Sequence, residues 1–405
     1  MSYLRKKRRF RIKDKRKFIK VTAIVGLLVF GVVIFLGNSY YSKKISVEVS
    51  QAPVITPKPT SFDELQYSEP TDFYSKLRNK EPIQVLILGD SIGEGTGAPR
   101  EVRWFLQLEA LIEKEYGVPA EFTNISRGGS NTFGQLVDYR TRINTDYRVD
   151  LIIISLGQND RGVYDEETFS PLYETLIREL KGYYPKAEIM PLIESSLINN
   201  QTFPEVIKQL SNHYDLQYVD LKTAFLESGK EYKDLSSDTV HPNTEGQTIY
   251  ANKIFERIKN NFENGRVPRT LTEPILNSST ELDKFDSFSF SNTFITDSEG
   301  FALVKGVFQG YKPGNYIIGK FSGDVLAFSV SGGPEFGVGD VYVDGEYVRS
   351  IKTFLETGNY SGSKSFIGSN FGPGEHTVKV VISDEKHKDS KGNKVAFSFI
   401  ITEDQ

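Results

Sequence analysis

The side chains with the clearest chemical potential are a serine and a histidine that lie far apart in the sequence. Ser91 ends a Gly-Asp-Ser sequence directly after the apolar run Ile83–Leu88. His241 follows Asp238 by three residues. A carboxylate at this spacing can orient the imidazole within one loop, fix its tautomer and stabilise the imidazolium as it forms. A serine hydroxyl is a weak nucleophile until such a base takes its proton. The pattern therefore fits nucleophilic attack on a carbonyl carbon.

Two further polar segments follow apolar runs. Asn159 lies in a Gly-Gln-Asn-Asp sequence after Val149–Leu156, and Gly128 and Gly129 lie in a loop that begins at Asn124. Each of these segments, taken singly, is more often an ordinary turn than a site. Other polar residues near these strand ends are expected to be solvated or structural loop residues: Arg127, Arg161, Tyr164 and Glu194.

The elements that must position these segments alternate between strands and helices. Apolar runs typical of buried parallel strands alternate with amphipathic helical patterns over about 180 residues. This alternation predicts a three-layer α/β/α sandwich with a parallel, flavodoxin-like sheet. Ligands bind such sheets at the carboxyl ends of the strands, where the polar segments lie. The predicted strands are 83–88, 121–125, 149–156, 188–193 and 217–219, and the predicted helices are 102–116, 133–143, 168–184, 203–214 and 242–261.

Together and in this order, the four segments resemble the signature of the SGNH/GDSL hydrolases, a family of serine esterases. The resemblance covers about Ile83 to Phe262 and departs from the familiar Gly-Asp-Ser-Leu only in having Ile92 in place of leucine. It implies that Ser91 is the nucleophile and that Asp238 and His241 complete the catalytic triad.

The resemblance also implies an oxyanion hole. Its donors would be the backbone N–H groups of Ser91 and Gly129 and the side-chain amide of Asn159, with Gly128 as the alternative glycine. Such donors stabilise the tetrahedral intermediate of acyl transfer. His241 would then protonate the leaving alcohol. We expect no metal and no organic cofactor.

The C-terminal third of the chain has a different texture. Short alternating strands with turn signals predict an all-β sandwich or jelly roll over residues 280–405. A hairpin with an Asp-Gly turn is expected over Val341–Val348. The segment is similar to jelly-roll modules beside SGNH domains in some carbohydrate esterases. Tyr342, Tyr347 and Phe354 could stack on sugar rings, but a packing or spacer role is an equal alternative.

The N-terminus carries a strong charge asymmetry. Eleven Lys/Arg and one acid lie between Arg5 and Lys20, whereas the rest of the chain is acidic. The uncharged run that follows, from Val21 and extended to Tyr41, is long enough to span a bilayer. We predict a cytoplasmic tail (1–20), a transmembrane helix (21–41), a linker (42–80) and an extracellular catalytic domain (81–265). A cleaved signal peptide is the alternative.

Composition excludes several function classes. The chain of 405 residues has no cysteine, which excludes disulfides and thiolate metal sites, and its four histidines are too dispersed for a metal-binding pair. The basic tail adjoins an apolar run, which favours a lipid bilayer rather than nucleic acid as its partner.

These features predict an extracellular, membrane-anchored serine esterase that removes acyl groups, foremost O-acetyl, from cell-surface carbohydrate. Three alternatives remain open from the sequence. They are an O-acetyltransferase with the same triad, a lipase- or lysophospholipase-like lipid esterase, and a non-catalytic surface binding protein. The intact set of signature residues argues against the last of these.

Overall fold

The structure is a computed structural model that describes residues 71–142, 148–275, 282–356 and 358–403. All of these residues fall within one compact unit. The predicted cytoplasmic tail, transmembrane helix and most of the linker lie outside the described residues. Within the described part of the chain, no helix is both long and apolar enough to cross a membrane.

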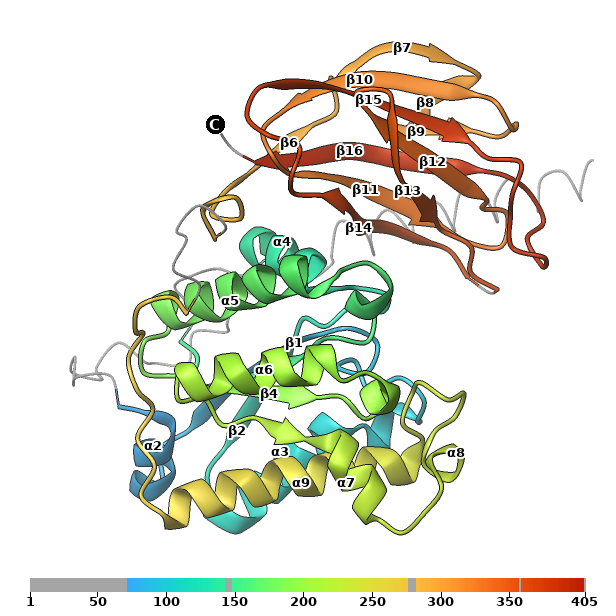
Figure 1. Cartoon of the computed structure of the whole chain (residues 1–405). Helices are drawn as coiled ribbons and strands as arrows, with labels where there is room; N and C mark the ends of the chain where they lie inside the picture. Colours follow the sequence, from blue (N-terminus) through green and yellow to red (C-terminus); the bar gives the residue numbers. More distant parts are fainter. Residues whose placement is uncertain (1–70, 143–147, 276–281, 357, 404–405) are drawn as a thin grey trace, which may run out of the picture. The chain divides into compact units, whose positions relative to one another are not determined.

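The first domain is built on a five-stranded parallel sheet (Figure 1). Its strand order is β2-β1-β3-β4-β5, the order of a doubly wound sheet in which β1 lies next to β3. The central strands consist almost wholly of buried aliphatic residues, as expected when both faces of a sheet are covered. The strands are β1 (Ile83–Gly89), β2 (Ala120–Asn124), β3 (Leu151–Ser155), β4 (Glu188–Ile193) and β5 (Val219–Asp220).

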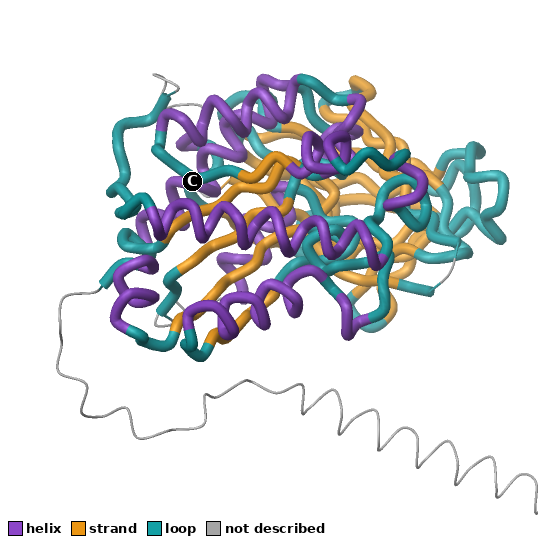
Figure 2. The backbone as a smooth tube through the Cα atoms, turned by 90° about the horizontal axis from the view of Figure 1, so that it is seen from below, coloured by secondary structure: helices purple, strands orange, loops and turns teal. Residues whose placement is uncertain are grey.

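Helices cover both faces of this sheet (Figure 2). One face packs against α4 (Thr132–Arg142), α5 (Glu166–Tyr183) and α6 (Thr202–His213). The other face packs against α2, α3, α7 and α9. Their bounds are α2 (Phe73–Asn79), α3 (Trp104–Tyr116), α7 (Leu221–Glu227) and α9 (Thr244–Glu263), and the short α8 spans Tyr232–Leu235.

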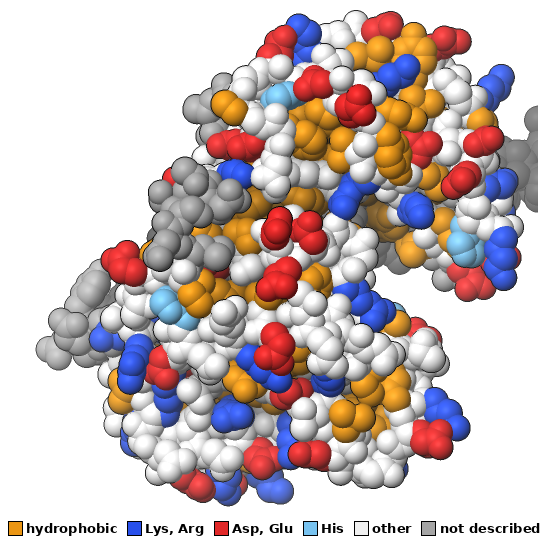
Figure 3. All heavy atoms as spheres, in the orientation of Figure 1, with side chains coloured by type: hydrophobic (Ala, Val, Ile, Leu, Met, Phe, Trp, Pro, Cys, Tyr) orange, Lys and Arg blue, Asp and Glu red, His pale blue; other side chains and the backbone are white. Residues whose placement is uncertain are grey.

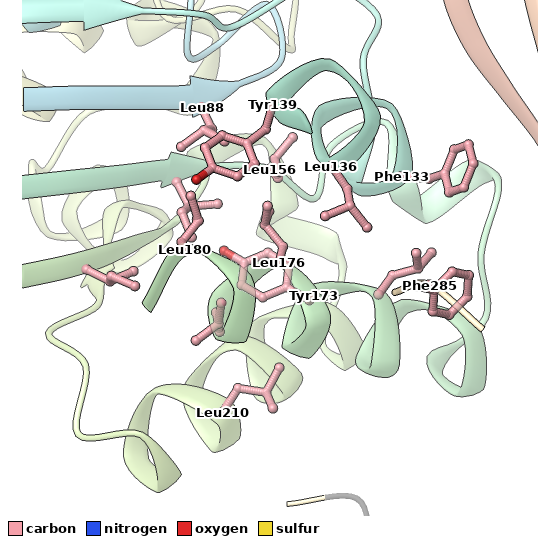
Figure 4. Close-up of a cluster of buried hydrophobic side chains, with 14 of the residues drawn as sticks. Leu88, Phe133, Leu136, Tyr139, Leu156, Tyr173, Leu176, Leu180, Leu210 and Phe285 are labelled. Atoms are coloured by element: carbon pink, nitrogen blue, oxygen red, sulfur yellow. The ribbon is translucent and has the colours of Figure 1, made fainter. Parts of the chain in front are cut away.

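Figure 4 shows part of the first core. Leu88 and Leu156 come from the sheet side, Leu136 and Tyr139 from α4, and further leucines and tyrosines from α5 and α6. Burying a side chain of this size contributes about 1.5–3 kcal/mol each. Because the core holds the sheet and these helices together, it also fixes the loops at the carboxyl ends of the strands.

Local signals explain where the helices begin. Asp72 accepts hydrogen bonds from the N–H groups of Tyr74 and Ser75 and so caps α2. Asn243 accepts from the first turn of α9 in the same way, which satisfies backbone donors that have no partner within the helix. A Cβ on Gly246 would lie 2.4 Å from the carbonyl oxygen of Leu235, so only glycine permits this close approach.

Helix α2 corrects one domain bound. The linker predicted over residues 42–80 overlaps this helix, in which Phe73, Tyr74 and Leu77 are buried against the second face of the sheet. Four prolines earlier in the segment are typical of a linker. The apolar spacing of the helix covers only two turns, which is too short a pattern to predict a helix. The ordered domain therefore begins before residue 81.

The C-terminal domain consists of two antiparallel sheets that enclose a core of their own. Phe328 and Phe397 from one sheet meet Val341 and Val380 from the other. One sheet has the order β13-β12-β15-β10-β7, and the other has the order β14-β11-β16-β9-β8 with β6 paired to β16. The bounds are β6 (Phe288–Ser291), β7 (Ile295–Glu299), β8 (Phe301–Val304), β9 (Val307–Gly310), β10 (Tyr316–Ser322), β11 (Leu326–Gly332), β12 (Val338–Val343), β13 (Glu346–Lys352), β14 (Tyr360–Gly368), β15 (Glu375–Ile382) and β16 (Val395–Glu403).

The predicted Asp-Gly hairpin is present between β12 and β13. Asp344 and Gly345 connect the two strands with φ of 51° and 90°. Two left-handed residues are what a two-residue hairpin turn requires, because their twist matches that of the strands. The turn prediction is therefore confirmed.

The outer face of the β14-β11-β16 sheet packs on the α/β domain. Phe366 of β14 contacts Phe133 of α4 and Tyr164, with ring centroids 5.1 and 5.2 Å apart. Ala327 and Ile401 belong to the same apolar cluster. This sheet is thus buried on both faces, which explains why its strands carry little of the apolar–polar alternation of an exposed sheet.

Candidate active site

Ser91 lies in the loop after β1, at the carboxyl edge of the sheet. The loop is anchored to the neighbouring strand, because the Asp90 N–H donates to the carbonyl of Ser155 at 3.1 Å. It is anchored from the other face of the sheet by Trp104, a fully buried residue whose indole N–H donates to the carbonyl of Ile92 at 3.0 Å. The loop that carries Ser91 is therefore held in place by hydrogen bonds from both sides.

The structure brings Ser91, His241 and Asp238 into one chain of hydrogen bonds. His241 Nε2 lies 2.8 Å from Ser91 Oγ, and His241 Nδ1 lies 2.6 Å from Asp238 Oδ2. A carboxylate can only accept, so the proton sits on Nδ1. Nε2 is then left as the acceptor for the serine hydroxyl, which is the arrangement a general base needs.

The loop of His241 is held by the same carboxylate. Asp238 Oδ1 accepts from the backbone N–H groups of Val240, at 3.0 Å, and of His241, at 2.8 Å. Burial opposes the charge, but these bonds and the imidazole together outweigh it and lower the pKa of Asp238. The turn places Thr239 at φ 71°, a left-handed conformation that is unfavourable for a β-branched residue. The segment from Asp238 to His241 is therefore a strained turn, and the carboxylate of Asp238 closes it.

The two glycines of the loop before α4 differ in their surroundings. A Cβ on Gly128 would lie 3.9 Å from Ser91 Cβ and 3.3 Å from a carboxylate oxygen of Glu94, whereas one on Gly129 would meet nothing within 4 Å. The N–H of Gly128 already hydrogen bonds to Glu94. Gly128 thus lies closer to the nucleophile, while Gly129, at φ 76°, is the glycine whose N–H is not engaged by Glu94.

Asn159 lies at the carboxyl end of β3, as expected, but its amide is already occupied. Asn159 Nδ2 donates to the carbonyl of Ser130 at 2.8 Å and to Asp90 Oδ2 at 3.2 Å. An amide nitrogen has two protons, so both have partners. The side chain is therefore held in place by the nucleophile loop and the glycine loop, and an oxyanion would have to share or replace the longer bond.

Three carboxyl groups lie buried beneath this surface. Asp90, Asp160 and Glu194 are each 0% exposed. Glu194 accepts from Ser155 Oγ at 2.7 Å and from the N–H of Gln158 at 3.0 Å, and Asp160 accepts from the N–H of Thr132 at 2.8 Å. These bonds tie the ends of β3 and β4 to each other and to the start of α4.

The buried carboxyl groups have too little positive charge near them to ionise at their usual pH. Burial raises the pKa of Asp90, and the neighbouring Glu194 raises it further. Burial also raises the pKa of Glu194 and raises that of Asp160 to about 6. Asp90 and Glu194 are hydrogen bonded to each other, which requires a proton between them.

Four polar residues near the strand ends were expected to be solvated or structural loop residues. Two of them are buried, and the other two are arginines that donate to backbone carbonyls. Tyr164 lies in the interface with Phe366, and Glu194 belongs to the buried carboxyl groups. Arg127 donates to the carbonyl of Gly362 at 3.1 Å, and Arg161 donates to that of Ser196 at 3.4 Å.

Sequence reasoning missed Asp90, Glu94 and Asp160 as parts of the site. Asp90 and Asp160 stand inside the signature segments, so their position was a usable signal. Glu94 had no such signal, because only folding places it beside the glycine loop. Within the described ranges, no group of three or more His, Cys, Asp or Glu residues could hold a metal ion.

Comparison with known proteins agrees with the fold. Residues 87–249 match the model of the GDSL-like lipase/acylhydrolase family. A two-domain esterase, CEX, active on acetylated mannans and crystallised with mannopentaose, is similar over 82% of this chain and 93% of its own, with 17% identity and a TM-score of 0.62.

An acetylxylan esterase from Geobacillus stearothermophilus, Axe2, is similar over 44% of this chain and 94% of its own, with 19% identity and a TM-score of 0.37. No curated protein matches. Residues 87–249 are thus a domain of the GDSL-like lipase/acylhydrolase family, and the chain is a serine hydrolase that acts on ester bonds.

Proposed function

We propose that the protein removes acyl groups, foremost O-acetyl groups, from carbohydrate through an acyl-enzyme on Ser91. The observation that carries this proposal is the chain of hydrogen bonds from Ser91 Oγ through His241 to Asp238, at 2.8 and 2.6 Å. A hydroxyl paired with an oriented imidazole is the arrangement of a nucleophile and its base.

In the first step, His241 Nε2 takes the hydroxyl proton while Ser91 Oγ attacks the ester carbonyl. Asp238 stays ionised and stabilises the imidazolium that forms. The tetrahedral intermediate collapses when the bond to the sugar oxygen breaks, and His241 returns the proton to that oxygen. Water then repeats the sequence on the acyl-serine and releases the carboxylic acid.

The oxyanion is assigned to the N–H groups of Ser91 and Gly129 and the amide of Asn159. Gly129 is preferred to Gly128 because the N–H of Gly128 is engaged by Glu94. Asn159 would keep its bond to Ser130 and turn its longer bond from Asp90 to the oxyanion. One donor of this kind contributes about 3–4 kcal/mol to the transition state.

A carbohydrate substrate is supported by two observations. The two-domain fold is similar to that of an esterase active on acetylated mannans. In addition, a cleft of about 390 Å³ begins at Gly129 and Asn131 and continues along strands β13 and β14. Its wall contains Tyr347 and Tyr360, and tyrosine rings offer an apolar face with a polar tip to a sugar.

We also propose that the enzyme works outside the cell on a membrane anchor. The support is the basic segment Arg5–Lys20 followed by an uncharged apolar run. Proteinase added to intact cells should then remove the catalytic domain without lysis. A domain that is degraded only after lysis would reject this location.

The proposed activity is tested by release of acetate from an acetylated glycan. The full-length wild type should release free acetate, and Ser91→Ala should lower turnover at least roughly 10⁴-fold. Acetate that appears on an added sugar acceptor rather than in solution would identify a transferase. An Ser91→Ala variant that retains turnover of p-nitrophenyl acetate would reject the proposal.

A further inference from the structure

The cleft that begins at Gly129 and Asn131 has an unusual charge. Among the described residues that line it are three cations and no carboxylate; the cations are Arg349, Lys352 and Lys364. On the face of the molecule seen in Figure 3, acidic and basic side chains are interspersed. The cleft therefore differs from a surface that only keeps the protein in solution.

Among these cations, Arg349 gives the strongest evidence that the cleft binds an anion. Its guanidinium donates to two carbonyl oxygens, of Phe366 at 3.0 Å and of Val163 at 2.6 Å. Burial lowers the pKa of Arg349, because the charge is partly removed from water. Among the described residues it has no carboxylate within ion-pair distance. A half-buried charge without an opposite charge is costly in the free protein and favours an anionic ligand.

Lys352 and Lys364 complete the wall in different ways. Lys352 is exposed and makes no ion pair with any described residue. Lys364 is 9% exposed and pairs with Asp138 at 3.0 Å. The structure thus offers one solvent-facing lysine for a ligand and one lysine whose charge is largely compensated.

The acids around the cleft stand behind its wall. Asp138 is held by Lys364 and by Arg127, at 3.0 and 3.4 Å. Asp340 accepts a hydrogen bond from Ser350 on the neighbouring strand, and Asp165 acts on Arg349 only through its field. Among the described residues, Lys364 is therefore the one cleft cation paired with a carboxylate, and Arg349 and Lys352 are left to bind an anion.

We propose that this cleft is a subsite for a negatively charged group on the glycan, so that the preferred substrate is an acylated acidic polysaccharide. The inference rests on the proposed function, because the cleft starts at Gly129 of the assigned oxyanion hole. Arg349 and Lys352 bind the anion while the neighbouring acylated sugar lies at Ser91. The anion is a uronate carboxylate or a phosphodiester, both of which such cations bind.

The direct test compares one polymer with and without its charge. Acetylated oligogalacturonate and its neutral methyl ester share the same backbone, and acetate release is measured for both with the full-length enzyme. Acetylated poly(glycerol phosphate) supplies the phosphodiester arm. We expect kcat/KM to be at least roughly tenfold higher for one of the two anionic substrates than for the neutral ester, and to fall with added salt.

The variant Lys352→Gln should reduce this preference about fivefold, measured as the ratio of kcat/KM for the charged and the neutral polymer. Lys312→Gln is the matched control, because Lys312 is an exposed lysine outside the cleft. Arg349→Lys keeps the charge and should retain most of the preference.

Equal turnover of charged and neutral polymers, or an unchanged preference in Lys352→Gln, would overturn the subsite. Loss of all esterase activity in the wild type would instead reject the proposed function. The two failures are therefore distinguishable.

Discussion

Two sets of side chains lie at the carboxyl edge of the sheet, and their carboxyl groups have opposite electrostatics. The surface set is Asp238 with His241, and the buried set is Asp90, Asp160 and Glu194. Asp238 is half exposed, accepts three hydrogen bonds from its own short loop and has a lowered pKa. Asp90 and Glu194 are fully buried, have raised pKa values and share a proton. The difference shows that the surface set is arranged for proton transfer and the buried set for support.

The two sets also differ in how they are built. The surface set depends on a three-residue spacing within one loop. The buried set draws its members from the ends of β1, β3 and β4 and meets only in the folded sheet. Removing a member of the first set should therefore affect chemistry, and removing a member of the second should affect stability and orientation.

The largest effect is expected for His241→Ala. Without the imidazole, no group accepts the proton of Ser91, so kcat should fall roughly 10⁴-fold or more while the free energy of unfolding changes little. Steady-state kinetics with p-nitrophenyl acetate and urea unfolding measure the two quantities. A large loss of stability with modest loss of activity would break the distinction between the two sets.

The next effect in size is expected for Asn159→Ala, which stands between the sets. Losing one oxyanion donor should lower kcat roughly 10²–10³-fold with a milder change in KM. An unchanged kcat would show that the amide only ties the loops together through Ser130 and Asp90. Asn131→Ala is a suitable control, because Asn131 lies in the same loop region and caps α4 through the N–H of Gly134.

Glu194→Ala should act mainly on stability. The change leaves the hydroxyl of Ser155 and the N–H of Gln158 without their buried acceptor, which costs about 2 kcal/mol or more. Urea unfolding at neutral pH measures this loss. A stability equal to that of the wild type would mean that the buried carboxyl group provides no net support.

The variant Glu194→Gln tests how the proton on Glu194 affects the stability of the fold. Burial raises the pKa of Glu194 from 4.5 to about 7, so over this range the folded state holds a proton that the unfolded state releases. The stability of the wild type must then decrease as pH rises across the same range, by up to about 1 kcal/mol per pH unit. An uncharged glutamine should flatten this dependence, as measured by unfolding between about pH 5 and pH 8. Identical pH profiles would contradict the raised pKa.

The smallest effect is expected for Thr239→Asn. Asparagine tolerates the left-handed conformation at φ 71° better than threonine, so the variant should be more stable by about 0.5–1 kcal/mol, with kcat within about twofold. Thr296→Asn, in strand β7, is the control and should gain nothing. A destabilised Thr239→Asn would show that the threonine side chain contributes more than its strain costs.

The sequence predicts most of the catalytic domain because its signals are local. The run Leu151–Ser155 is apolar throughout, and the spacing of Asp238 and His241 lies within one turn. The pairing of Gly128 with Glu94 could not be predicted, because it joins two loops through folding alone. The cleft along β13 and β14 could not be predicted either, because it depends on how one domain packs on the other.

The most direct test of the account is to map the site of a serine-directed fluorophosphonate on the full-length enzyme. Mass spectrometry of its peptides should find one adduct, on Ser91, and the adduct should be absent from Ser91→Ala and strongly reduced in His241→Ala, because the hydroxyl reacts only when His241 Nε2 accepts its proton. An adduct on another residue, or labelling of Ser91 that does not depend on His241, would contradict the account.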